Sequence, residues 1–317
     1  TLIFLIFSYL IIVSCESPLK VALKEVVKTY STPIAEISPL NGEGISDTTS
    51  IIIIFTEEMN PATLELSGTL ISQSNEGVWS ADGGIPNTIL TLSPLATWQQ
   101  GSGHFFSLSC QDTDGYDLPA VIVTYGVLDG NVYVNSNDGS NANPGTASEP
   151  KADIRTAIEL ADRYYSTAEV RVSGGVYNVD YSEDSHVVLV EGISVYGGYS
   201  PEDWSNRDPG AYESKIQDSS AIITGDPTPE VDRSRAVACD PGITGATIFD
   251  GFTVVGGSGS VSIGFDCSAA EPTIQNNELS GGSGEYTAGL RIRDASPHVT
   301  GNTISGGIAV IASVGVY

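Results

Sequence analysis

Basic residues, cysteines and long apolar runs are all scarce in this chain of 317 residues. Thirteen Lys and Arg stand against 39 Asp and Glu, which gives a formal net charge of −26. A chain this acidic is repelled by other polyanions, which disfavours nucleic acid and anionic membrane surfaces as direct partners. The longest apolar run, residues 1–13, is shorter than the roughly 20 residues that cross a bilayer as a helix.

The motifs of several common chemistries are also absent. The three histidines lie far apart and form no His-x-His or i, i+4 pair, so no zinc centre is predicted. There is no Gly-x-Ser-x-Gly elbow and no Gly-rich phosphate loop. We therefore predict no catalytic residue, no metal ligand and no cofactor. Calcium stays open at two oxygen-rich segments. For residues 112–118 hairpin-turn chemistry is the better interpretation, and for residues 135–145 a Gly/Asn/Pro loop explains the composition equally well.

What the chain does contain is a repeat with a period of 25 residues. TIFDGFTVVGG begins at Thr247, PTIQNNELSGG at Pro272 and PHVTGNTISGG at Pro297, so the spacing is 272 − 247 = 297 − 272 = 25. No helical apolar pattern lies inside the period. A fixed repeat of this length predicts a solenoid whose coils stack on one another.

Alternation inside the repeat predicts which side chains fill the solenoid, because successive residues of a strand face opposite sides. Two apolar sets share register positions: Phe249, Ile274 and Val299, and Val254, Leu279 and Ile304. We expect both sets inside. On the second strand of the repeat, Asp266 and Arg291 fall at outward positions of adjacent coils. This predicts a surface ion pair contributing about 0 to 1 kcal/mol.

Polar and sulfur-bearing residues also align between coils. Asn277 and Asn302 share a register, which predicts a ladder of amide hydrogen bonds from coil to coil. Cys239 and Cys267 are candidates for a disulfide between neighbouring coils, although sequence does not decide the geometry. Cys110 alternates with two apolar residues in its strand and is predicted to be a buried thiol.

The repeat resembles right-handed parallel β-helix proteins, the fold of pectate lyases and of many bacterial surface proteins. The resemblance extends upstream through YVNSNDGSNANPGTASEP from Tyr133, DIRTAIELA from Asp153 and VRVSGGVYNV from Val170. This order is similar to the opening of such domains, with a first strand, a loop, a capping helix and a first coil. Apolar residues at Ile154, Ala157, Ile158 and Ala161 independently predict the amphipathic helix.

The preceding block, residues 33–128, contains short β-rich runs bounded by turn residues. Residues 51–55 and 88–92 are typical of strands in an antiparallel sandwich. ISPLNGEG, FTEEMNPATL, LTLSPLATW and DTDGYDL resemble the bacterial Ig-like domain first associated with S-layer proteins. Such modules commonly act as spacers or adhesive units, and the resemblance implies that role here.

The N-terminal segment predicts the cellular location. Residues 12–15, Ile-Val-Ser-Cys, resemble the lipobox of bacterial lipoprotein signal peptides, which implies acylation of Cys15 and a membrane contact through that lipid. A buried strand or short helix is the alternative for this apolar run. The predicted organisation is a signal segment (1–15), a linker (16–32), an Ig-like domain (33–128) and a β-helix domain (129–317) that we expect to be incomplete.

These features together predict an all-β, exported lipoprotein on the envelope or outer membrane surface of a bacterium. Its predicted role is to bind or adhere to polysaccharide or extracellular matrix. A polysaccharide lyase or glycoside hydrolase of the β-helix type is the alternative. That alternative needs converging carboxylates, yet Asp250 aligns with Gln275 and Thr300, so no acidic ladder forms.

Overall fold

The computed structural model of this chain describes residues 33–180, 185–220 and 233–317. They divide into two compact units. One contains residues 33–39, 50–93 and 106–122, and the other contains residues 40–49, 94–105 and 123–317. The predicted signal segment, Cys15 and the linker lie outside the described residues.

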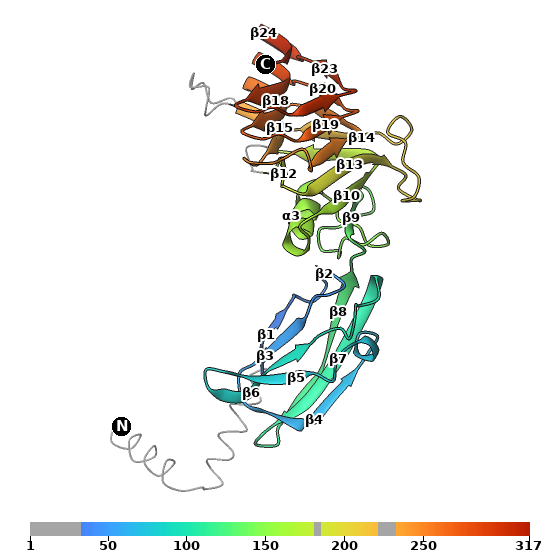
Figure 1. Cartoon of the computed structure of the whole chain (residues 1–317), viewed down its shortest axis with the longest axis vertical. Helices are drawn as coiled ribbons and strands as arrows, with labels where there is room; N and C mark the ends of the chain where they lie inside the picture. Colours follow the sequence, from blue (N-terminus) through green and yellow to red (C-terminus); the bar gives the residue numbers. More distant parts are fainter. Residues whose placement is uncertain (1–32, 181–184, 221–232) are drawn as a thin grey trace, which may run out of the picture. The chain divides into compact units, whose positions relative to one another are not determined.

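Two sheets form the β-sandwich predicted for the first part of the chain (Figure 1). In pairing order, the first consists of β1 (Ile34–Ser38), β3 (Ile51–Phe55), β6 (Ile85–Leu92) and β5 (Val78–Asp82). The second consists of β2 (Gly44–Ile45), β8 (Asp117–Val127), β7 (Gly101–Asp112) and β4 (Met59–Ser67), and a 3₁₀ turn, η1 (Ile71–Gln73), follows β4. Buried and partly exposed residues alternate along β7, where Phe106, Leu108 and Cys110 point into the core.

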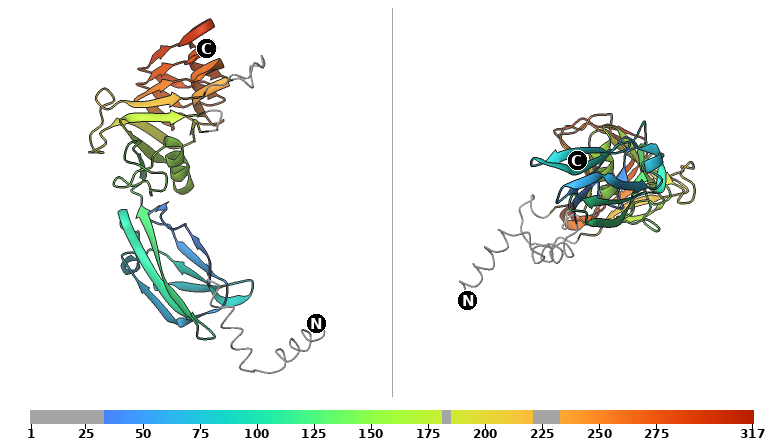
Figure 2. Two further views of the ribbon diagram at one scale, coloured as in Figure 1. Left: turned by 180° about the vertical axis from the view of Figure 1, so that it is seen from behind. Right: turned by 90° about the horizontal axis from the view of Figure 1, so that it is seen from below.

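Three parallel sheets make up the stacked coils predicted for the second part (Figures 1 and 2). The β9–β22 sheet contains β9 (Asn131–Val134), β10 (Ala168–Ser173), β13 (Ile193–Tyr199), β16 (Ile248–Asp250), β19 (Thr273–Gln275) and β22 (His298–Thr300). The β11–β23 sheet contains β11 (Gly175–Val179), β14 (Ser214–Asp218), β17 (Phe252–Val255), β20 (Glu278–Ser280) and β23 (Thr303–Ser305). The β12–β24 sheet contains β12 (Val187–Leu189), β15 (Arg233–Cys239), β18 (Ser258–Ser268), β21 (Ser283–Arg293) and β24 (Ile308–Val316). The chain is therefore mostly β, and the predicted parallel β-helix architecture is confirmed.

The register of these sheets follows the 25-residue period. Phe249 pairs with Ile274 and Ile274 with Val299, while Val254, Leu279 and Ile304 pair in the same way. Phe249 and Ile274 are fully buried. Val299 is 37% exposed, because β22 is the last strand of its sheet and has a neighbour on one side only.

A single α-helix, α3 (Ile154–Tyr164), lies among the described residues and packs on β9, β10 and β12. Asp153 caps its N-terminus by accepting a hydrogen bond from the backbone N–H of Thr156 at 2.7 Å. Its buried face is Ile154, Ala157, Ile158, Leu160 and Ala161, as the spacing predicts. In the described part of the chain no helix has the length and apolarity to span a membrane.

Candidate functional site

Asn277 and Asn302 lie at equivalent corners of successive coils, after β19 and β22. Asn277 Nδ2 and the Asn277 backbone N–H both donate to Asn302 Oδ1, at 3.0 and 2.9 Å. Each amide also donates to a carbonyl of the preceding coil: Asn277 Nδ2 to Phe249 at 3.1 Å and Asn302 Nδ2 to Ile274 at 2.8 Å. Because these hydrogen bonds are made within the solenoid, the two side chains hold the corners rather than face a ligand.

The structure also brings Cys239 and Cys267 side by side on adjacent coils. Cys239 ends β15, Cys267 lies near the end of β18, and the preceding pair, Ala238 and Asp266, is in register. Both cysteines are free thiols. Cys110 is buried as predicted, and burial raises the pKa of its thiol to about 11, so this thiol stays protonated and unreactive at neutral pH.

The two oxygen-rich segments are built as turns. Asp112 Oδ1 accepts hydrogen bonds from the backbone N–H groups of Asp114 and Tyr116, at 2.8 and 2.9 Å. Asn135 Oδ1 accepts one from the backbone of Asn137 at 2.9 Å. These oxygens serve their own backbone, as in Asx turns. Among the described residues, no group of three His, Cys, Asp or Glu side chains forms a candidate metal site.

A groove of about 710 Å³ runs across the outer face of the β12–β24 sheet. It is lined by Val261, Ile263, Tyr286, Thr287, Ala288, Arg291, Ile292, Arg293, Ala312, Val314 and Tyr317. In the register, Val261 lies beside Tyr286 and Ile263 beside Ala288, so the floor continues from coil to coil. The lining residues include two arginines and no acidic residue, which is unusual in a chain with a net charge of −26.

This groove exists because β18 changes face at Gly264. Phe265 packs in the interior, with its ring centroid 5.3 Å from that of Phe249, whereas Ile263 lines the groove. In a regular strand these two residues would share a face. A Cβ at Gly264 would lie 2.6 Å from the Ser280 carbonyl oxygen, so only glycine permits this close approach. Strict alternation therefore does not predict the groove. The one feature of the sequence that points to it is the pair of aliphatic residues before Gly264, Val261 and Ile263.

One wall of the groove corrects the predicted surface ion pair. Arg291 does bind Asp266, through Nε to Oδ1 at 2.9 Å and Nη2 to Oδ2 at 2.6 Å. Arg235 Nη1 donates to the same carboxylate at 3.0 Å. However, the Asp266 side chain is completely buried and that of Arg291 is 9% exposed, so the prediction of a surface pair is wrong. The cause is that β15 and β21 flank β18 and their arginines cover the carboxylate from both sides.

The electrostatics of this wall favour the charged carboxylate. Burial raises the pKa of Asp266, but the hydrogen bonds and charges of Arg291 and then Arg235 outweigh burial and hold this pKa below its ordinary value. Arg291 is the member of this ion pair that lines the groove. Arg293, which is exposed at the end of β21, also lines the groove and carries a positive charge.

A second cluster of cations and rings lies on the β9–β22 sheet. The guanidinium carbons of Arg171 and Arg207 lie 5.7 and 5.8 Å from the ring centroid of Tyr199, and the Trp204 ring is 5.0 Å from that of Tyr133. Both arginines already hold carboxylates, Glu169 at 2.8 Å and Asp250 at 2.6 Å. These contacts hold the 200–212 loop against the sheet, so we assign the cluster a structural role.

This placement also separates the carboxylates considered for catalysis. Asp250 belongs to the β9–β22 sheet and Asp266 to the β12–β24 sheet, and each is paired with arginine. The structure does not bring these two carboxyl groups together in one groove, which a two-carboxylate glycosidase requires.

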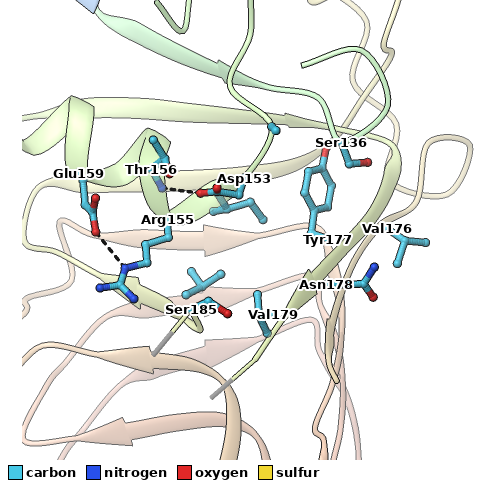
Figure 3. A pocket seen from close by; sticks show the side chains of 13 residues that line it. Ser136, Asp153, Arg155, Thr156, Glu159, Val176, Tyr177, Asn178, Val179 and Ser185 are labelled. Atoms are coloured by element: carbon cyan, nitrogen blue, oxygen red, sulfur yellow. Dashed lines mark hydrogen bonds and ion pairs between the residues drawn. The ribbon is translucent and has the colours of Figure 1, made fainter. Parts of the chain in front are cut away.

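A smaller pocket of about 570 Å³ lies beside the start of α3 (Figure 3). Asp153, Arg155 and Glu159 line it from the helix side, and Tyr177 and Asn178 line it from β11. Its charges are already matched, since Arg155 Nε lies 2.9 Å from Glu159 Oε1 and the helix N-terminus is capped by Asp153. The groove on the β12–β24 sheet is therefore the better candidate for a binding site.

The fold defines a class: antiparallel sheets followed by a parallel β-helix. Residues 137–317 match the family model described as "Protein of unknown function (DUF1565)". This match covers more than half of the chain, and the chain belongs to that family.

Several solved structures show partial similarity. An L,D-transpeptidase from Mycobacterium smegmatis is 16% identical, with 34% of this chain and 44% of that chain covered and a TM-score of 0.23. CopC from Methylosinus trichosporium OB3b is 14% identical, with 30% and 90% covered and a TM-score of 0.23. The Yersinia enterocolitica Family 28 exopolygalacturonase is 9% identical, with 84% and 59% covered and a TM-score of 0.22. The chain spans less than half the length of the transpeptidase. No curated protein matches it.

Proposed function

We propose that this chain is an exported, lipid-anchored protein of the bacterial envelope that binds polysaccharide, free or in an extracellular matrix, in the groove on its β12–β24 sheet. The lipobox-like residues 12–15 support export and anchoring through Cys15. The resemblance of residues 33–128 to S-layer-type Ig-like domains supports a spacer or adhesive role for the first unit. The observation that carries the binding proposal is a groove lined mainly by apolar residues, with an exposed tyrosine, Tyr286, and an exposed arginine, Arg293.

The chemistry of the groove favours an acidic polysaccharide. Tyr286 is 47% exposed and offers a ring face to the apolar face of a sugar. Arg293 is exposed and presents a planar donor group that suits carboxylate or sulfate groups, and no acidic residue in the lining opposes it. The continuous register from β18 to β21 lets one extended chain contact successive coils.

Binding to an array of neutral and acidic glycans, followed by titration of the strongest ligand, tests this function. We expect acidic glycans to be retained, and Arg293→Ala to weaken binding about tenfold, or about 1.4 kcal/mol. Tyr286→Ala is expected to weaken it by a similar factor. Lys215→Ala removes the same charge from a different sheet and serves as the matched control, with affinity expected to stay unchanged. Equal losses for Arg293→Ala and Lys215→Ala would contradict a binding site in the groove.

The enzymatic alternative makes a different prediction for the same samples. A lyase would release unsaturated sugars and a hydrolase would release reducing ends from the bound polysaccharide. Because Asp250 and Asp266 lie on different sheets and are each held by arginine, we expect neither product. Release of either product, lost on Asp266→Asn, would replace binding with catalysis as the function.

The anchor is tested separately from the groove. Cells expressing the full chain are fed a fatty-acid probe, and we expect the wild type to be labelled and Cys15→Ala to be unlabelled. An unlabelled wild type would remove the argument for an envelope anchor and leave the groove proposal unaffected.

A further inference from the structure

Two of the four cysteines sit where two consecutive coils meet. Cys239 lies directly after Ala238, which pairs with Asp266, and Cys267 lies directly after Asp266. Adjacent parallel strands are about 4.8 Å apart, and disulfides join residues whose Cα atoms are roughly 4.4 to 6.8 Å apart. The backbone therefore holds the pair within bridging range.

The thiols already interact and differ in accessibility. The Cys239 thiol donates a hydrogen bond to Cys267, which raises the pKa of Cys239, with burial adding to the effect, and lowers the pKa of Cys267. Cys267 is fully buried and also lies 3.3 Å from the Ala270 carbonyl oxygen through Sγ. Cys239 is partly exposed. Cys239 is thus the more exposed residue of the pair.

We propose that Cys239 and Cys267 are a modification site, at which a disulfide oxidant links two consecutive coils of the solenoid. One cysteine of the pair, as its thiolate, attacks one sulfur of the oxidant's disulfide, and the other oxidant sulfur leaves as a thiolate. The thiolate of the second cysteine then attacks the cysteine sulfur that carries the oxidant, forming the Cys239–Cys267 bond and releasing the second oxidant thiolate. Two electrons pass to the oxidant, and the two protons lost by the cysteines reprotonate the released thiolates.

This inference is independent of the ligand in the groove. The bond would tie β15 to β18, the strands that carry Arg235 and Asp266. Cys110 belongs to the other unit and is buried in β7. Among the described residues, Cys239 and Cys267 are therefore each other's candidate partner for a disulfide.

Incubation of the folded full chain with oxidised glutathione, followed by alkylation and peptide mass mapping, tests the site. We expect one peptide cross-link joining Cys239 to Cys267 and the loss of both thiols. The midpoint of thermal unfolding is expected to rise by roughly 5 to 15 °C on oxidation and to return on reduction.

Two variants make the outcome specific. Cys15→Ala is expected to retain the cross-link, whereas Cys239→Ser, at the partly exposed position, is expected to lose both the cross-link and the thermal shift. Persistence of both thiols, glutathione left on Cys239, or a cross-link to Cys15 or Cys110 would each overturn the proposal.

Discussion

At the scale of single residues, Asp266 forms a buried ion pair that joins three neighbouring strands of one sheet. Its carboxylate is fully buried, yet it receives three N–H donors from Arg235 and Arg291. A buried charge without partners is costly, whereas one held by charge-assisted hydrogen bonds is stable. Its importance follows mainly from the two arginines that bind it.

Asp266→Asn is therefore expected to destabilise the chain by about 3 kcal/mol, because it leaves two guanidinium groups facing a neutral amide beneath the protein surface. Chemical denaturation of the two proteins measures this difference. Asp240→Asn makes the same charge change at an exposed position one coil away and is expected to stay within about 0.5 kcal/mol of the wild type. Similar stabilities for both variants would contradict the role assigned to Asp266.

The lowered pKa of Asp266 adds a prediction about pH. A carboxylate whose pKa is lower in the folded than in the unfolded state stabilises the fold above the unfolded value, which is near 4. That contribution is lost as the pH falls through the folded-state pKa. The difference in unfolding free energy between wild type and Asp266→Asn is thus expected to shrink between about pH 6 and about pH 2. If the difference in unfolding free energy between the two proteins stays constant over this pH range, protonation of Asp266 is not coupled to folding.

At the scale of elements, the corners of the coils depend on amide hydrogen bonds rather than on strand pairing. Asn277 is 2% exposed, and its Oδ1 accepts from the backbone of Phe252 at 2.9 Å while its Nδ2 reaches two further acceptors. The strands on either side, β19 and β20, have three residues each. Such short strands need a fixed corner to keep their side chains in register.

Asn277→Ala is expected to cost about 2 to 3 kcal/mol of unfolding free energy, because it removes the hydrogen bonds of this side chain to the Phe252 backbone N–H, the Phe249 carbonyl oxygen and Asn302 Oδ1. Asn178→Ala, at an exposed position of β11, is the matched control and is expected to change stability by less than about 0.5 kcal/mol. Thermal or denaturant unfolding compares the pair. If both variants unfold together, the corner amides do not hold the coils.

At the scale of the whole molecule, two opposing electrostatic effects act on an acidic ligand. The net charge of −26 repels it at long range, while the arginines of the groove attract it at close range. The Debye length is about 30 Å at 0.01 M salt and about 3 Å at 1 M. Added salt therefore screens the distant repulsion first and the local attraction later.

Affinity for an acidic glycan is accordingly expected to pass through a maximum near 0.1 M salt, as measured by titration between about 0.01 and about 1 M. A neutral glycan of equal length serves as the control and is expected to show little dependence. Affinity that rises steadily to the highest salt would indicate that the arginines contribute nothing to binding.

The sequence by itself determined the stacked-coil architecture, because its 25-residue period and alternation depend on local chain geometry. The register of Phe249, Ile274 and Val299 and the alignment of Asn277 with Asn302 follow from counting along the chain. Only the tertiary structure decided that Ile263 and Phe265 face opposite sides and that Asp266 is buried. Those outcomes depend on a glycine packed against the next strand and on arginines from both neighbouring coils, and alternation within one strand carries no information about either.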